Sequence, residues 1–119
     1  MSNKLKFAFV LEYVTDIEAA KNFYVDVLGL EIERYSPVFV QFNNFAIASD
    51  ESMSGTRDPE LYWLVDDAEA AFKDLSLKGE ISMPLKQMPF GKVFGIQDSN
   101  GRPRYIFEPA RNRPSQAMK

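Results

Sequence analysis

The chain has 119 residues, of which 45% are hydrophobic and 26% are charged, and its formal net charge at pH 7 is −3. This length suits one compact domain rather than two. Neither cysteine nor histidine occurs, which excludes disulfides, thiolate nucleophiles and zinc–thiolate sites and removes the commonest base near neutral pH.

The first predicted element is a strand over residues 5–14, where apolar side chains alternate with the period of two that strands show. A helix follows, because Thr15 and Glu18 have the spacing of a capping box. Gly29 stands where a helix commonly ends in a left-handed residue. The buried side of this helix is expected to consist of Ile17, Ala20, Tyr24, Val27 and Leu28.

Three further strands are predicted after this helix, over residues 30–35, 38–42 and 45–49. The turns between them are marked by Ser36–Pro37 and Asn43–Asn44.

The same order of elements then recurs. The stretch "VTDIEAA" at residues 14–20 returns as "VDDAEAA" at residues 65–71. A strand over 60–65 leads to a helix with Asp66 and Glu69 at its start and Gly79 at its end. The expected buried side of this second helix is Ala68, Ala71, Phe72 and Leu75, and the expected strands after it are 81–88, 92–97 and 104–109.

Each half therefore reads as strand, helix and three strands, which predicts an α+β fold of two βαβββ modules. Neither half is long enough to bury its own sheet, so the modules should pair, within the chain or across a dimer. The interpretation is one domain over 1–110, with module one at 4–49, a linker at 50–59 and module two at 60–109. A flexible tail is expected at 111–119.

Two segments carry a resemblance to a known family. "YVTDIEAAKNFYVDVLGLEI" resembles the opening signature of the vicinal oxygen chelate superfamily, which includes glyoxalase, bleomycin-resistance proteins and extradiol dioxygenases. "PFGKVFGIQDSNGRPRYIFEP" resembles its closing strands. The resemblance implies that the two modules form a curved mixed sheet shaped as a cup.

The resemblance also implies four metal-ligand positions, and few of them hold a ligand here. The first-strand positions are Phe9 and Glu60, and the last-strand positions are Tyr105 in module two and Ala46 or Ala48 in module one. A single carboxylate among four positions is a poor site even for a hard cation such as magnesium. We therefore expect a metal-free pocket without a cofactor.

The pocket-facing side of the sheet is expected to be aromatic. Aromatic faces stack against planar or cationic ligands, and an apolar hollow with a few polar groups is typical of small-molecule sites. The predicted ligand-binding residues are Phe9, Leu11, Tyr13, Phe39, Glu60, Tyr62, Leu64, Phe90, Phe94, Tyr105 and Phe107.

Structural roles compete with each of these assignments. Any single Phe on an alternating strand can belong to the core instead, and Trp63 and Phe23 are interpreted as packing residues. Glu60 can be solvated at the start of its strand. Glu12 falls on the face under the helices, where it needs either a bulge that turns it into the pocket or a partner such as Lys21.

Three functions remain open. The first, which we favour, is a protein that holds an aromatic or cationic molecule, such as an antibiotic, as bleomycin-resistance members do. The second is a metal-independent lyase or isomerase with Glu12 or Glu60 as base and Tyr105 or Tyr13 as acid. A carboxylate within hydrogen-bonding reach of a tyrosine would favour it. The third is a protein-interaction module.

The expected partners follow from charge and resemblance. The acidic balance argues against nucleic acid, and no segment reads as a membrane span or signal peptide, so a cytoplasmic location is expected. The resemblance implies a homodimer, with Pro89 to Lys92 near the partner.

Overall fold

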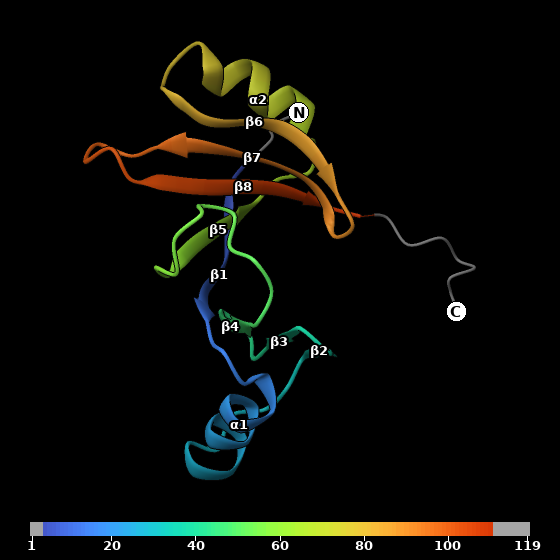
Figure 1. Cartoon of the computed structure of the whole chain (residues 1–119). Coiled ribbons are helices and arrows are strands. Elements are labelled where there is room, and N and C mark those ends of the chain that lie inside the picture. Colours follow the sequence, from blue (N-terminus) through green and yellow to red (C-terminus); the bar gives the residue numbers. More distant parts are fainter. Residues whose placement is uncertain (1–3, 111–119) are drawn as a thin grey trace. The chain divides into compact units, whose positions relative to one another are not determined.

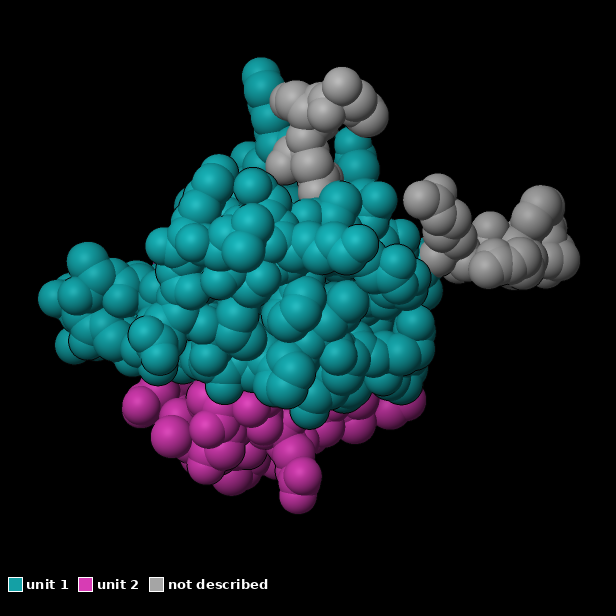
Figure 2. Space-filling view, turned by 90° about the horizontal axis from the view of Figure 1, so that it is seen from above, with its two compact units in different colours: residues 1–6, 63–119 teal, residues 7–62 magenta. Residues whose placement is uncertain are grey.

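The computed structural model describes residues 4–110, so the predicted tail at 111–119 lies outside the described residues. Two compact units are coloured separately in Figure 2. Unit 2 comprises residues 7–62, and the described part of unit 1 comprises residues 4–6 and 63–110.

Unit 2 contains the first predicted module. Its elements in chain order are β1 (Lys6–Tyr13, whose first residue belongs to unit 1), α1 (Ile17–Asn22), the π-helix η1 (Phe23–Val27), β2 (Arg34–Ser36), β3 (Phe39–Gln41) and β4 (Phe45–Ala48). The strands lie in the order β2-β3-β4-β1. β1 runs parallel to β4, and the β2–β3 and β3–β4 pairs are antiparallel. The predicted order of elements is confirmed.

Helix α1 begins one residue later than the capping box predicted. Asp16 has extended backbone angles and its Oδ1 accepts a hydrogen bond of 3.0 Å from the Ala19 backbone N–H. A capping side chain must reach the amides of the first turn from an extended residue directly before it. Asp16 satisfies this requirement, so the assignment of the cap to Thr15 is wrong.

The end of the first helix changes which residues are buried. Residues Phe23–Val27 form a π-helix, in which each hydrogen bond spans one residue more than in an α-helix. This shifts the register, and Val27 and Leu28 are 67% and 54% exposed. Their predicted burial is therefore wrong, whereas Gly29, at φ 76°, ends the helical segment as predicted.

The two faces of the unit 2 sheet carry different residues. In the β1–β4 register Leu11 pairs with Ala46 and Tyr13 with Ala48 on one face, and Glu12 pairs with Ile47 on the other. The second face packs under the helices in a core of Val40, Phe42 and Ile47, surrounded by Val14, Ile17, Ala20, Tyr24, Val25, Leu30 and Phe45.

Unit 1 contains the end of β5 (Glu60–Leu64), followed by α2 (Ala68–Ser76), β6 (Ile81–Met88), β7 (Gly91–Gln97) and β8 (Pro103–Pro109) (Figure 1). β7 pairs antiparallel with both β6 and β8. Asp67, not Asp66, caps α2 through a bond of 3.1 Å from the Ala70 amide to its Oδ1.

The core of unit 1 confirms the predicted buried side of α2. It consists of Val65, Ala68, Ala71, Phe94 and Ile106, packed against Trp63, Phe72, Leu75, Ile81, Leu85 and Ile96. The α+β class with two βαβββ modules is thus confirmed. Among residues 4–110, no helix combines the length and hydropathy that crossing a membrane requires.

The cap of α1 gives a direct test of the corrected helix start. Asp16→Ala removes the acceptor for the Ala19 amide, so we expect it to lower the free energy of unfolding by about 1 kcal/mol. Thr15→Ala is the matched control and should change stability much less. Urea unfolding followed by circular dichroism measures both. A larger loss in the Thr15 variant would show that the capping box is the true start.

Candidate functional site

Glu60 is a buried carboxylate in unit 2. Although it opens β5 directly after Pro59, Glu60 is only 3% exposed, so the alternative of a solvated Glu60 is wrong. Its Oε1 accepts hydrogen bonds from the hydroxyls of Tyr13 at 2.7 Å and Tyr62 at 3.0 Å. Its Oε2 accepts a bond of 2.9 Å from the backbone N–H of Ser54. Three donors thus surround one negative charge.

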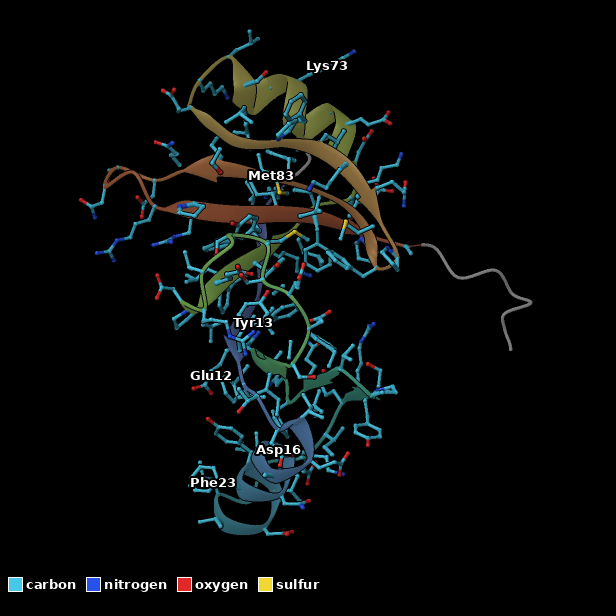
Figure 3. All side chains as sticks on the ribbon, in the orientation of Figure 1. Glu12, Tyr13, Asp16, Phe23, Lys73 and Met83 are labelled. Carbon is cyan, nitrogen blue, oxygen red and sulfur yellow. The ribbon has the colours of Figure 1, made fainter. Side chains whose placement is uncertain are left out.

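Strand geometry explains why these groups meet. Tyr13 is the last residue of β1, and it is labelled in Figure 3 next to Glu12. Tyr62 stands two residues after Glu60 on β5, so both side chains leave the strand on the same face. Ser54 comes from the irregular segment between β4 and β5. We call Tyr13, Ser54, Glu60 and Tyr62 the Glu60 cluster.

Aromatic rings lie beside the Glu60 cluster. The Phe9 ring centroid lies 5.2 Å from that of Tyr62 and 5.8 Å from that of Phe39. Leu11, two residues after Phe9 on β1, is also buried. Unit 2 therefore brings together the predicted site residues Phe9, Leu11, Tyr13, Phe39, Glu60 and Tyr62.

Burial governs the protonation of the two tyrosines. Loss of solvent raises the pKa of Tyr13, and the neighbouring Glu60 raises it further. Burial is also the main cause that raises the pKa of Tyr62, and the charge of Glu60 is the second. Both phenols therefore stay protonated near neutral pH and act as donors. An unpaired carboxylate in such a place would cost several kcal/mol, and these donors offset that cost.

Arg57 lies over the Tyr13 ring. Its guanidinium carbon is 5.5 Å from the Tyr13 ring centroid, within the range of a cation–π contact. Its Nη2 donates to the Val14 carbonyl oxygen at 3.1 Å.

Glu12 has a different partner from the one expected. It stays on the helix-facing side of the sheet, opposite Ile47, and no bulge turns it. The Tyr24 hydroxyl donates to its Oε1 at 2.8 Å, whereas Lys21 pairs with Glu18 at 2.9 Å. Glu12 is therefore held by Tyr24 and lies on the face opposite Tyr13.

Other predicted site residues fall in unit 1. Tyr105 and Phe107 are buried on one face of β8, and Phe90 is 42% exposed in contact with the Phe107 ring. Phe94 pairs with Ile106 and packs against Phe72 under α2. Its predicted place on the pocket face is therefore wrong, since the strand register sets it on the opposite side from Tyr105.

A shallow depression of about 280 Å³ in unit 1 has a different lining from the predicted pocket. Leu64 is the one predicted site residue among its lining residues, which are Lys4, Lys6, Leu64, Val65 and Asp66.

The implied metal positions in unit 2 do not fit a metal. Phe9, Ala46 and Ala48 offer no ligand atom in their side chains, and both Glu60 oxygens already accept hydrogen bonds. Within residues 4–110, no three His, Cys, Asp or Glu side chains gather as a metal site would require.

Sequence reasoning missed Ser54 and Arg57. Both lie in the segment interpreted as a plain linker, and both reach the residues around Tyr13 and Glu60. The Ser, Thr and Gly content of this segment indicated a turn-rich loop. A backbone donor has no side-chain signature, so its contact with Glu60 could not be predicted.

A family model matches most of the chain. The model described as Glyoxalase/Bleomycin resistance protein/Dioxygenase superfamily matches residues 6–113. None of the curated proteins matches the chain.

Solved structures show the same fold. A Legionella pneumophila protein described as NAD-dependent benzaldehyde dehydrogenase is 23% identical at a TM-score of 0.72, covering 87% of this chain and 99% of that one. A superfamily member from Vibrio splendidus is 20% identical at 0.64, covering 88% and 99%. Homoprotocatechuate 2,3-dioxygenase from Brevibacterium fuscum is 19% identical at 0.59, covering 92% of this chain, which spans 38% of that enzyme. At these identities the likeness shows the fold alone.

The half-buried phenol of Tyr13 and the buried phenol of Tyr62 predict an alkaline loss of stability. Their pKa values are raised in the folded chain, so their contribution to stability is complete below the ordinary tyrosine pKa of about 10. It falls as the pH rises through their folded-state pKa values, because the unfolded chain releases these protons first. Urea unfolding at several pH values from neutral to strongly alkaline measures this loss.

Tyr13→Phe and Tyr62→Phe should each lower stability at neutral pH by about 1–3 kcal/mol, because a buried carboxylate loses a donor. Each should also flatten the alkaline decline. Tyr35→Phe is the matched control, since Tyr35 donates to Glu18 at an exposed site, and it should cost much less. Equal losses in all three variants would contradict a special role for the Glu60 cluster.

Proposed function

Because the chain belongs to the Glyoxalase/Bleomycin resistance protein/Dioxygenase superfamily, we propose that it binds a small aromatic or cationic molecule without a metal. The observation that carries this proposal is the buried Glu60 carboxylate, bonded to Tyr13 and Tyr62 and flanked by the Phe9 ring. The ligand would bind at the Glu60 cluster in unit 2.

Energetics support a functional role for Glu60. Apolar residues in place of a buried charged group are often neutral or stabilising, so a buried carboxylate is weak evidence for stability alone. Perturbed titratable groups concentrate at functional sites instead. Tyr13 and Tyr62, with their raised pKa values, have this character.

The charge of the cluster indicates the class of ligand. The Glu60 carboxylate attracts a cationic group and repels an anionic one, and its low exposure strengthens both effects. The rings of Tyr13 and Phe9 add a surface on which a planar or cationic group gains about 0.5–2 kcal/mol. A ring that carries an ammonium group matches both features.

The donor set supports binding without a metal. The groups around Glu60 are two phenol O–H groups and one amide N–H, which donate hydrogen bonds. A divalent cation requires several oxygen atoms that converge with free lone pairs. The described residues around Glu60 supply one carboxylate, so we derive no step through a metal.

A second candidate function rests on the same distances. The Tyr13 and Tyr62 hydroxyls lie 2.7 and 3.0 Å from Glu60 Oε1, which is within the range for proton transfer. A metal-independent lyase or isomerase would use Glu60 as the base. Tyr13 would then return a proton to the product. Glu12 is not a candidate base here, because it lies on the opposite face of the sheet.

The role of the Glu60 charge can be tested with three ligands that share the same ring and differ in net charge. Tryptamine, tryptophol and indole-3-acetate share an indole and are cationic, neutral and anionic at pH 7. We expect tryptamine to bind most tightly and Glu60→Gln to weaken it by at least about tenfold, or about 1.4 kcal/mol. Isothermal titration calorimetry with EDTA present measures the three affinities.

Glu12→Gln is the matched control for this experiment. It neutralises a tyrosine-bonded carboxylate on the same strand as Tyr13 but on the other face. It should leave tryptamine binding unchanged within about twofold. Equal binding of all three indoles, or equal loss in both variants, would contradict the proposed site.

The second candidate has its own test. In deuterium oxide with EDTA, an acid–base enzyme should exchange the α-protons of a hydroxyketone such as dihydroxyacetone, as followed by proton NMR. Glu60→Gln should abolish this exchange and Glu12→Gln should not. Binding of tryptamine without any exchange would favour the first candidate over the second.

A further inference from the structure

Residues 50–59 connect β4 to β5 without a helix or strand (Figure 1), and hydrogen bonds within this segment hold it together. The Ser52 hydroxyl donates to the Thr56 carbonyl oxygen. The hydroxyl oxygens of Ser54 and Thr56 lie 2.9 Å apart, and the Thr56 hydroxyl oxygen accepts a bond of 3.2 Å from the Asp58 amide. These bonds shape the segment without a helix or strand.

The segment contacts Glu60 and Tyr13 through several groups, and those of Ser54 and Arg57 bear on ligand binding. The Ser54 backbone N–H donates to Glu60 Oε2 at 2.9 Å. The Arg57 guanidinium lies over the Tyr13 ring and donates to the Val14 carbonyl oxygen at 3.1 Å. Both contacts lie within unit 2.

These two contacts have the chemistry that we assign to the ligand. Arg57 places a cation on the Tyr13 ring, and Ser54 places an N–H donor on the carboxylate oxygen that the tyrosines leave open. A protonated amine on an aromatic ring would make the same two contacts. The segment and such a ligand therefore compete for the same atoms.

We infer that Asp50–Pro59 is a strap that occupies the ligand contacts of Glu60 and Tyr13 in the free protein. This inference rests on the proposed function, and it adds both a regulatory element and a narrower ligand class. The ligand must carry a cation together with an N–H donor to replace both contacts. Arg57 is the latch, a positioning residue that holds the strap closed.

The contacts of Arg57 are weak enough to let the strap open. Arg57 is exposed, and outside the strap it contacts the Tyr13 ring and the Val14 backbone oxygen. Contacts of exposed groups contribute little net stability. Glu60, by contrast, is buried and keeps its two tyrosine donors when the strap leaves. Opening therefore exchanges one donor on Glu60 and does not strand the charge.

Hydrogen exchange tests the latch without any ligand. In ¹⁵N-labelled protein, Arg57→Ala should accelerate exchange of the Ser54 amide by about tenfold or more. Arg34→Ala is the matched control, because Arg34 is an exposed arginine on β2 of the same unit, and it should leave this exchange unchanged. Unchanged exchange in the Arg57 variant would overturn the latch.

Stopped-flow fluorescence with tryptamine tests the competition. Arg57→Ala should raise the association rate several-fold, whereas Arg34→Ala should not. Arg57→Lys, which keeps the cation but loses the fork of donors, should fall between wild type and Arg57→Ala. An unchanged or slower association in Arg57→Ala would overturn the strap as a competitor of the ligand.

The two measurements separate this inference from the proposed function. Faster Ser54 exchange with no tryptamine binding in any variant would overturn the proposed function and the competition, and it would still support Arg57 as the latch. Faster exchange together with faster association would support both.

Discussion

The arrangement of unit 2 depends on keeping one carboxylate out of water. Glu60 is buried at the first residue of β5, and its charge is stabilised only if donors converge on it. Tyr13 comes from the end of β1, Tyr62 from the same face of β5, and the Ser54 amide from the irregular segment before it. Three stretches of chain are thus tied to a single charge. Loss of either tyrosine hydroxyl removes a donor from Glu60 Oε1 and leaves the carboxylate less well satisfied.

Unit 2 holds a second carboxylate–tyrosine pair that separates structural from functional roles. Glu12 and Tyr13 are neighbours on β1, so strand alternation sends them to opposite faces. Glu12 meets Tyr24 among core rings on the helix side, where the Tyr24 ring contacts Phe42 and Phe45. The Tyr24 hydroxyl thus satisfies the Glu12 carboxylate with a hydrogen bond on the helix-facing side of the sheet. Tyr13 and Glu60, by contrast, are contacted by the loop before β5, through the exposed Arg57 and the Ser54 amide.

Local patterns in the sequence predicted the elements well, because period and turn chemistry act over a few residues. The alternating apolar residues predicted β1, and Gly29 predicted the end of the helical segment. The errors concerned the first residue of the helix, the π-helix and the strand register. Asp16, not Thr15, has the extended backbone that lets its side chain cap the helix. The π-helix Phe23–Val27 shifts the helical register, so Val27 is exposed. The facing of Phe94 required the β7–β8 register, which no local pattern contains.

The part of the site that the sequence left open was the partner of Glu60. The family resemblance implies metal-ligand positions at Glu60 and Phe9, and it did not indicate the hydrogen-bond donors that surround Glu60 here.

In this chain the neighbouring strand supplies Tyr13, and β5 itself supplies Tyr62. Phenol O–H groups stabilise the charge as donors, which is the electrostatic task that a metal performs as a Lewis acid. The same donors occupy Oε1 and leave Oε2 to the Ser54 amide, which is the contact that the proposed ligand would replace. Under the proposed function, the two tyrosines stabilise the Glu60 charge by hydrogen bonds while the second carboxylate oxygen would recognise an amine.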